Sequence, residues 1–123
     1  MNVIMNNNIT CFDVDDTLAI WPKDFRINKP GRVKFLYGGE NVYLEEHSFH
    51  TLFLKQCYLR GDHVIVWSAN GYEWARQVVA EFKLEQHVSL VMSKPIRHVD
   101  DKEEKTSIVG PRVFIPHETY DND

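Results

Sequence analysis

The sequence predicts an α/β fold built around a parallel β-sheet. Continuous apolar segments of strand length alternate with segments of helical period, and polar residues directly follow the apolar segments. Strands that are apolar throughout are typical of parallel sheets with both faces covered by helices. We therefore expect one Rossmann-like domain over residues 1–123, with helices flanking a sheet of about five parallel strands.

The first expected elements are a strand and a hairpin. Residues 9–12 form an apolar run that leads into an acidic segment, which predicts a buried strand. Residues 32–37 and 42–44 flank the segment 38–41, which contains two glycines, and this pattern predicts a β-hairpin. The stretch of about residues 19–44 is therefore expected to form a small β-hairpin flap.

Helices and further strands are expected in the rest of the chain. Residues 48–60 have a helical period, with Ser48 as the expected N-cap and Gly61 as the expected stop. The apolar residues that follow this period are Phe49, Leu52, Phe53, Cys57 and Leu59. A second helix over residues 72–84 carries an apolar side of Trp74, Ala75, Val78, Val79 and Phe82. Strands are expected at residues 64–67, 88–92, 96–99 and 112–115.

Length, charge and cysteine content limit the class of protein. A chain of 123 residues with 43% hydrophobic residues suits one compact core, and its net charge of −4 argues against a surface that is basic throughout. Cys11 and Cys57 form no CxxC pair, so neither a disulfide framework nor a cysteine zinc site is predicted. The sequence has no signal-peptide pattern at its start and no apolar run of membrane-spanning length. We expect a cytoplasmic domain with no membrane contact.

Polar residues follow the expected strands at one edge of the sheet. The carboxyl ends of parallel strands meet at this edge, where ligands of such sheets bind. Five carboxylates, two hydroxyls and a lysine are expected there: Asp13, Asp15, Asp16, Ser68, Ser93, Lys94, Asp100 and Asp101. Crowded carboxylates repel one another unless they are protonated or bridged by a cation, so a hard divalent metal such as Mg²⁺ is predicted.

These residue types suit phosphoryl transfer. A carboxylate can attack a phosphoryl group and form an aspartyl-phosphate. A neighbouring carboxyl group can protonate the leaving oxygen and then activate water. A lysine and a hydroxyl can balance and orient the phosphoryl oxygens during the transfer.

Four short motifs, in this order, resemble those of the haloacid dehalogenase-like hydrolases. The segment Asp-Val-Asp-Asp-Thr-Leu at residues 13–18 resembles the first motif of that family, DxDxT. Ser68, at the end of an apolar strand, resembles the second motif, and Lys94 resembles the third. The acidic pair Asp100-Asp101 resembles the fourth.

The resemblance implies a role for each motif. Asp13 would be the nucleophile and Asp15 the general acid/base, and an acid two residues after the nucleophile favours phosphatase over dehalogenase chemistry. Mg²⁺ would be held by the Asp13 carboxylate, the Asp15 main-chain carbonyl and either Asp100 or Asp101. Ser68 and Lys94 would contact the phosphoryl group. Further substrate contacts are expected from Asp16, Thr17, Ala69 and Asn70.

The short flap suggests the kind of substrate. Large caps of that family are inserted after the first or third motif. This chain has room only for a hairpin after the first motif, and Lys94 leads almost directly into the fourth expected strand, so the chain resembles a capless member with an open site. Within residues 21–37 of this flap, five basic residues outnumber a single acid, Asp24: Lys23, Arg26, Lys29, Arg32 and Lys34. This excess would favour a nucleotide or a nucleic-acid end as the phosphorylated substrate. The alternative is solubilising charge on an exposed hairpin edge.

Two other classes of function stay open. One is a receiver-like signalling domain that accepts phosphate, although the third expected strand ends in Val-Met-Ser without the aspartate such a domain needs. The other is a catalytically idle binding module with the same fold. Beside the motifs, Trp21 is a candidate for the mouth of the pocket. His47 and His50 have a spacing compatible with a metal, but a solvated or capping role is favoured.

Overall fold

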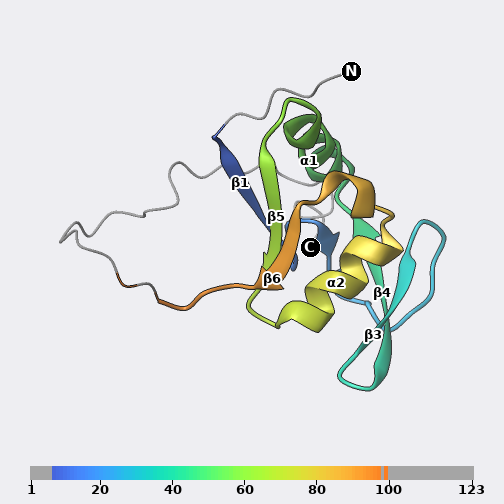
Figure 1. Cartoon of the computed structure of the whole chain (residues 1–123). Coiled ribbons are helices and arrows are strands. Elements are labelled where there is room, and N and C mark those ends of the chain that lie inside the picture. The colour runs from blue at the N-terminus through green and yellow to red at the C-terminus, as the bar shows by residue number, and fades with distance from the viewer. Residues whose placement is uncertain (1–6, 98, 100–123) are drawn as a thin grey trace.

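The computed structural model describes residues 7–97 and 99, and within them the chain is an α/β fold with two separate sheets (Figure 1). The parallel sheet has the strand order β1-β5-β6, with β1 at Ile9–Asp13, β5 at His63–Ser68 and β6 at Leu90–Ser93. The antiparallel sheet has the order β2-β4-β3, with β2 at Ala19–Ile20, β3 at Val33–Tyr37 and β4 at Glu40–Glu46. The helices are α1 at Ser48–Leu59, α2 at Tyr72–Glu81 and a short 3₁₀ helix, η1, at Glu85–His87.

The parallel sheet confirms the predicted α/β class. The expected strand at residues 96–99 is wrong for its described part, because Ile96, Arg97 and Val99 lie outside any strand. The side chains of Ile96 and Val99 are also 86% and 97% exposed. Pro95 provides a physical reason, since proline has no N–H to donate to a sheet and here directly precedes the segment. The expected strand at residues 112–115 lies outside the described residues.

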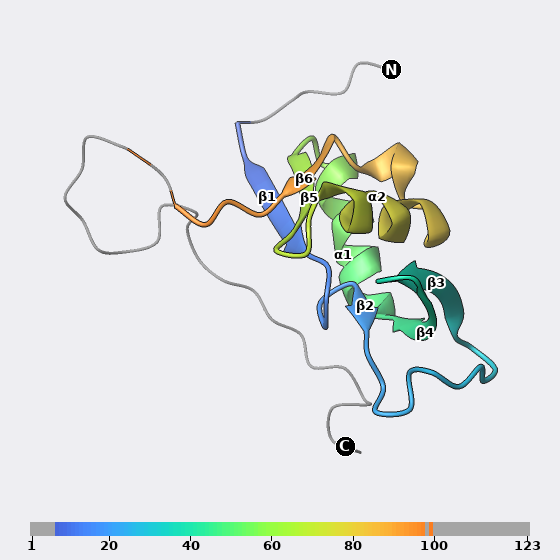
Figure 2. The same cartoon turned by 90° about the horizontal axis from the view of Figure 1, so that it is seen from below.

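Both helices cover the same face of the parallel sheet (Figure 2). The connections from β1 through α1 to β5, and from β5 through α2 to β6, advance in one direction across the sheet. Right-handed crossovers therefore place both helices on one side. On this side Phe12, Val64 and Val66 are buried, whereas Ile65 and Trp67 on the other face are partly exposed. The expectation of helices on both faces is thus not met by the part of the chain that the structure describes.

The predicted hairpin is present, but it is not a detached flap. Gly38 and Gly39 form a two-residue turn with φ of 58° and 82°, the left-handed backbone that this type of tight hairpin turn requires. The sheet formed by β2, β4 and β3 directs Phe35, Val42 and Leu44 into the same hydrophobic core as the parallel sheet. The hairpin is therefore part of the core of the molecule.

The first helix is rotated relative to the face that the sequence predicts. Its buried residues are His50, Thr51, Leu54 and Cys57, whereas Phe49, Leu52 and Leu59 are more than half exposed. Its N-cap is His47, whose Nδ1 accepts a hydrogen bond from the His50 N–H at 3.2 Å, so the prediction of Ser48 as N-cap is wrong. Gly61 follows the helix with φ of 99°, as expected of a helix stop.

The second helix buries the face that its sequence predicts. Trp74, Ala75, Val78 and Val79 are buried, and so is Phe82 at its C-cap. Phe35 lies against Trp74 and Phe82 with ring centroids 5.5 Å and 5.4 Å apart, so α2 joins the two sheets. Neither α1 nor α2, the two α-helices within residues 7–97 and 99, is both long and apolar enough to cross a membrane.

Candidate active site

The ends of all three parallel strands contribute to one edge of the molecule. Asp13 is the last residue of β1, Ser68 of β5 and Ser93 of β6, with Lys94 directly after. The register pairs Ser68 with Ser93 and Asp13 with Trp67, so the strands end almost level. The sequence therefore placed these four side chains correctly at the carboxyl edge. The expected metal residues Asp100 and Asp101 lie outside the described residues.

Asp13 and Lys94 form an ion pair across the end of the central strand. The Lys94 Nζ lies 3.1 Å from the Asp13 Oδ2, and the side chains are 41% and 42% exposed. The backbone N–H of Lys94 donates to the Ser68 carbonyl at 2.8 Å, which fixes the residue after β6 against β5. An exposed pair of this kind contributes little to stability. Its importance is therefore local, because it places a positive charge beside a carboxylate that solvent can reach.

Asp15 is held by N–H donors at both of its carboxylate oxygens. The indole N–H groups of Trp21 and Trp74 donate to Oδ1 at 2.8 Å and 3.0 Å. The side-chain amide of Asn70 donates to Oδ2 at 2.7 Å. Hydrogen bonds to a carboxylate are among the stronger ones in proteins, so three of them fix the orientation of this group.

The loop that carries Asp15 is held by hydrogen bonds within the loop and by a buried histidine. The Val14 carbonyl accepts from the N–H groups of Thr17, Leu18 and Ala19, and Asp16 adopts the left-handed conformation with φ of 57°. Aspartate tolerates this conformation better than most residues, and such strain often marks a functional site. The buried His50 contacts the Thr17 carbonyl through Nδ1 at 2.8 Å. A carbonyl oxygen only accepts, so this contact requires the proton on Nδ1.

His47 supports the same loop, and the histidine pair therefore has a structural position. The His47 N–H donates to the Leu18 carbonyl at 2.9 Å, and its ring stacks on that of His50 with centroids 3.7 Å apart. The capping role considered for the pair is confirmed for His47. The solvated role is wrong, because both side chains are buried beneath the loop.

The segment after β5 forms a turn that leads straight into α2. The Ser68 Oγ accepts from the Asn70 N–H at 3.0 Å, and the Ser68 carbonyl accepts from the Gly71 N–H at 3.1 Å. The helix begins at Tyr72, whose N–H donates to the Ser93 Oγ at 3.0 Å. A helix N-terminus carries a partial positive charge, so this end of α2 favours an anion at the strand edge. Ser68 itself is only 2% exposed.

The other expected substrate contacts are at the rim of the site. Asp16 is exposed and its Oδ1 accepts from the Trp21 backbone N–H at 3.0 Å. Thr17 is partly buried, and Ala69 is exposed beside Asn70. The structure thus brings Asp13, Asp15 and Lys94, together with Ser68 and Asn70, to one edge, with the remaining three residues in the adjoining loops: Asp16, Thr17 and Ala69.

The described residues provide oxygen donors for a metal but not a complete set. No three His, Cys, Asp or Glu side chains within residues 7–97 and 99 are grouped as a metal site. The Asp13 carboxylate is accessible, and carboxylate oxygen is a donor that Mg²⁺ prefers. The Asp15 side chain faces three N–H groups, an environment suited to hydrogen bonding rather than to a cation. From this residue only the main-chain carbonyl fits a metal.

The two cysteines are unsuited to act as nucleophiles. Burial raises the pKa of the Cys11 thiol, and the negative charge of Asp13 raises it further. Burial also raises the pKa of the Cys57 thiol, which is on the buried side of α1. Because the thiolate is the reactive form, both groups are less reactive than an ordinary cysteine. Among these groups Asp13 is the one whose exposure and position suit nucleophilic attack.

The positive charge of the hairpin region is largely balanced by acids. Asp24 pairs with both Lys29 and Arg32, and Arg32 also lies 3.7 Å from Glu45. Arg26 lies 3.6 Å from Glu40 and stacks over the Phe25 ring. The acids Glu40 and Glu45 come from β4, outside the segment whose charge excess suggested a polyanion. This balance weakens the case for a nucleic-acid surface and favours the alternative of paired, solubilising charge.

Two tryptophans of the site were not assigned their role from sequence. Trp74 was predicted as a core residue, and it is buried, but its N–H also binds Asp15. Trp21 was a candidate for the pocket mouth, and its indole N–H holds Asp15 from the loop after β2. No sequence pattern indicates an indole donor, because Trp74 is 59 residues from Asp15.

Comparison of the chain with family models, curated proteins and solved structures gave no match.

Proposed function

We propose that this chain is a Mg²⁺-dependent phosphatase of the haloacid dehalogenase-like type, acting through a phosphoenzyme on Asp13. The observation that carries the proposal is the arrangement of two aspartates at one strand edge. Asp13 is accessible and paired with Lys94, and Asp15, two residues later, is fixed by three N–H donors. An accessible aspartate beside a firmly oriented one suits a nucleophile and a separate acid/base group. The proposal includes the fuller parallel sheet, of about five strands, that the family resemblance implies.

In the first proposed step an Asp13 carboxylate oxygen attacks the phosphorus atom. The bond from phosphorus to the leaving oxygen breaks, and that oxygen takes a proton from Asp15. Lys94 and the N-terminal end of α2 offset the negative charge of the phosphoryl group as it approaches Asp13. The Ser68 hydroxyl, oriented by the Asn70 N–H, donates to a phosphoryl oxygen.

In the second step water attacks the phosphorus atom of the aspartyl-phosphate. Asp15, now ionised, takes a proton from the water, and the bond between the Asp13 oxygen and phosphorus breaks to release inorganic phosphate. The Asp13 carboxylate, the Asp15 main-chain carbonyl and Asp100 or Asp101 are the proposed ligands of Mg²⁺. When bound, the ion would offset the negative charge of the phosphoryl oxygens.

An assay with a small aryl phosphate such as p-nitrophenyl phosphate tests the proposal. We expect phosphate release that requires Mg²⁺, and we expect Asp13→Asn to lower kcat by at least about a thousandfold, because it removes the nucleophile. Glu81→Gln, an acid-to-amide change at the exposed far end of α2, is the control and should retain full activity.

Two outcomes would reject the proposal in favour of the other classes. Activity that survives Asp13→Asn would exclude a phosphoenzyme on this residue. A folded protein that lacks activity on all phosphoesters, but becomes a stable phosphoprotein with acetyl phosphate, would indicate a receiver-like domain.

A further inference from the structure

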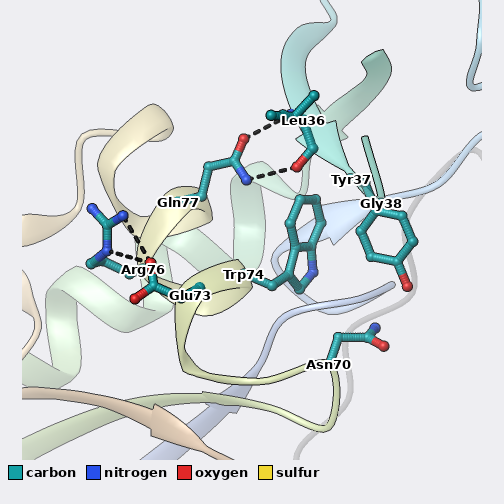
Figure 3. Close-up of a pocket in the computed structure, with 8 residues that line it drawn as sticks. All are labelled: Leu36, Tyr37, Gly38, Asn70, Glu73, Trp74, Arg76 and Gln77. Atoms are coloured by element: carbon teal, nitrogen blue, oxygen red, sulfur yellow. Dashed lines mark hydrogen bonds and ion pairs between the residues drawn. The ribbon is translucent and has the colours of Figure 1, made fainter. Parts of the chain in front are cut away.

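A surface hollow lies between the end of β3 and the first turns of α2, beside the candidate active site (Figure 3). Its volume is about 560 Å³, which lies within the range of small-molecule pockets, about 300–1,000 Å³. The residues that line this β3–α2 hollow are Leu36, Tyr37, Gly38, Asn70, Glu73, Trp74, Arg76 and Gln77. It is therefore formed by the antiparallel sheet on one side and by the helix of the parallel sheet on the other.

The walls of the hollow are fixed to each other. The Gln77 side-chain amide accepts from the Leu36 N–H at 2.8 Å and donates to the Leu36 carbonyl at 2.9 Å (Figure 3). This pair of bonds matches what a neighbouring strand would make with the edge of β3. Tyr37 lies edge-on to Trp74, with ring centroids 4.9 Å apart and planes at 74°. The space between hairpin and helix is thus a preformed feature, which reduces the entropic cost of binding.

The hollow is continuous with the acid/base group through two shared residues. Asn70 and Trp74 line it and also donate to the Asp15 carboxylate, at 2.7 Å and 3.0 Å. In the proposed reaction the leaving oxygen must approach Asp15 to receive its proton. The rest of the leaving group, attached to that oxygen, then extends past Asn70 and Trp74 into the hollow.

The lining favours a neutral leaving group with a planar ring. Its only charged residues are Glu73 and Arg76, which pair with each other at 3.0 Å, so the lining has no net charge. The Tyr37 ring and the exposed Leu36 side chain offer apolar contact, while the Asn70 amide and the Tyr37 hydroxyl offer polar contact. A nucleoside combines a neutral planar base with sugar hydroxyls and matches both requirements.

We infer that the β3–α2 hollow binds the nucleoside part of a nucleoside monophosphate. The hydrolysis of that nucleotide rests on the proposed phosphatase function, whereas the binding of its nucleoside part in the hollow does not. It favours a free nucleotide over a nucleic-acid end, because a polynucleotide would bring further phosphates to a lining without excess positive charge.

Binding of nucleosides, which lack the phosphate, tests the hollow separately from the chemistry. Calorimetric titration with adenosine, guanosine, cytidine and uridine should show binding of at least one of them to both the wild type and Asp13→Asn. Tyr37→Leu should weaken this binding about tenfold or more, because stacking of a base on an aromatic ring is lost. Tyr43→Leu is the matched control, since Tyr43 belongs to the same hairpin but does not line the hollow, and it should bind as the wild type does.

A second variant protects the test from loss of folding. Leu36 is 58% exposed, so Leu36→Ala should fold normally and still weaken nucleoside binding by about threefold through lost apolar contact. Equal binding by the wild type, Tyr37→Leu and Leu36→Ala would overturn the inference.

Kinetics then separate failure of the inference from failure of the proposed function. For the wild type, kcat/KM should be higher for a nucleoside 5′-monophosphate than for ribose 5-phosphate, and Tyr37→Leu should reduce this ratio about tenfold. An unchanged ratio in an enzyme that hydrolyses p-nitrophenyl phosphate would overturn the inference alone. Nucleoside binding without any turnover would overturn the proposed phosphatase function but support the nucleoside-binding site. A higher kcat/KM for a 5′-phosphorylated oligonucleotide than for the nucleoside monophosphate would overturn the inference and indicate a nucleic-acid end as the substrate.

Discussion

At the scale of single residues, the candidate site depends on how Asp15 is held. Trp21, from the loop after β2, and Trp74, from α2, approach the same carboxylate oxygen from different parts of the fold. Their rings also belong to one aromatic cluster, in which the Tyr37 centroid lies about 5 Å from each. Packing of the core therefore determines the orientation of Asp15, the proposed acid/base group. We regard both tryptophans as positioning residues.

Replacement of Trp21 tests this positioning role. Trp21→Phe retains an aromatic ring but removes one N–H donor to Asp15, and we expect kcat to fall by about tenfold or more, the equivalent of one hydrogen bond to a charged group. KM should change little, because the residues proposed to bind the phosphoryl group are untouched. Steady-state kinetics with p-nitrophenyl phosphate measure both constants.

Trp67→Phe provides the matched control for this prediction. Trp67 lies on β5 at the partly exposed face of the parallel sheet, and its replacement leaves the three N–H donors to Asp15 in place. If Trp21→Phe and Trp67→Phe lower kcat equally, Trp21 acts only through general stability and the positioning role is wrong.

At the scale of elements, the connection between β2 and β3 is stabilised by a cluster of charges around Asp24. Hydrogen bonds from Lys29, and then from Arg32, lower the pKa of the Asp24 carboxyl from 3.8 to about 2. The guanidinium of Arg32 also donates to the Asp24 and Ile27 carbonyls at 3.1 Å and 3.0 Å. These contacts give an irregular segment a defined path without a strand or helix.

The lowered pKa of Asp24 predicts a specific pH dependence. A carboxyl group whose pKa is lower in the folded than in the unfolded state stabilises the fold above its unfolded pKa, and this stabilisation is lost as the pH falls through the folded pKa. We therefore expect the wild type to be more stable than Asp24→Asn at pH 6, with the difference disappearing between about pH 4 and about pH 2. Urea unfolding at a series of pH values measures the difference. A difference in the free energy of unfolding that stays constant down to the lowest pH would contradict the lowered pKa of Asp24.

At the scale of the whole molecule, the two sheets share one hydrophobic core. Phe35 of β3 is 1% exposed and lies between the rings of Trp74 and Phe82 from α2. Val42 and Leu44 of β4 belong to the same cluster as Val64 and Val66 of β5. The antiparallel sheet should therefore unfold together with the parallel sheet rather than open as an independent flap.

Truncation of Phe35 tests this shared core. Phe35→Ala should lower the free energy of unfolding by about 3–5 kcal/mol, as expected for a large buried side chain, and unfolding should remain a single transition. Urea unfolding followed by tryptophan fluorescence and by far-ultraviolet circular dichroism should give coincident curves. Leu36→Ala, at the adjacent exposed position, should change the free energy by less than about 0.5 kcal/mol. Separate transitions in the two signals would mean that the hairpin is an independent unit.

The sequence by itself determined the local elements and the residues at the strand ends. Apolar runs followed by polar residues located β1, β5 and β6 to within one residue at their carboxyl ends, where Asp13, Ser68 and Ser93 lie, because strand ends depend on short-range pattern. The two glycines located the hairpin turn, since few other residues accept its backbone angles. These features involve neighbours in the chain, and pattern alone is sufficient to find them.

The tertiary structure alone decided which face of α1 is buried and which contacts hold the candidate site. The burial of His50 in place of Phe49 and Leu52 depends on how α1 packs against the loop after β1, and no periodicity contains that information. The N–H donors to Asp15 come from residues 6, 55 and 59 positions away along the chain. Long-range contacts of this kind depend on packing, whose energy is spread over many residues. The position of the motif residues at the strand ends was therefore predictable from the sequence, whereas the contacts that hold Asp15 were not.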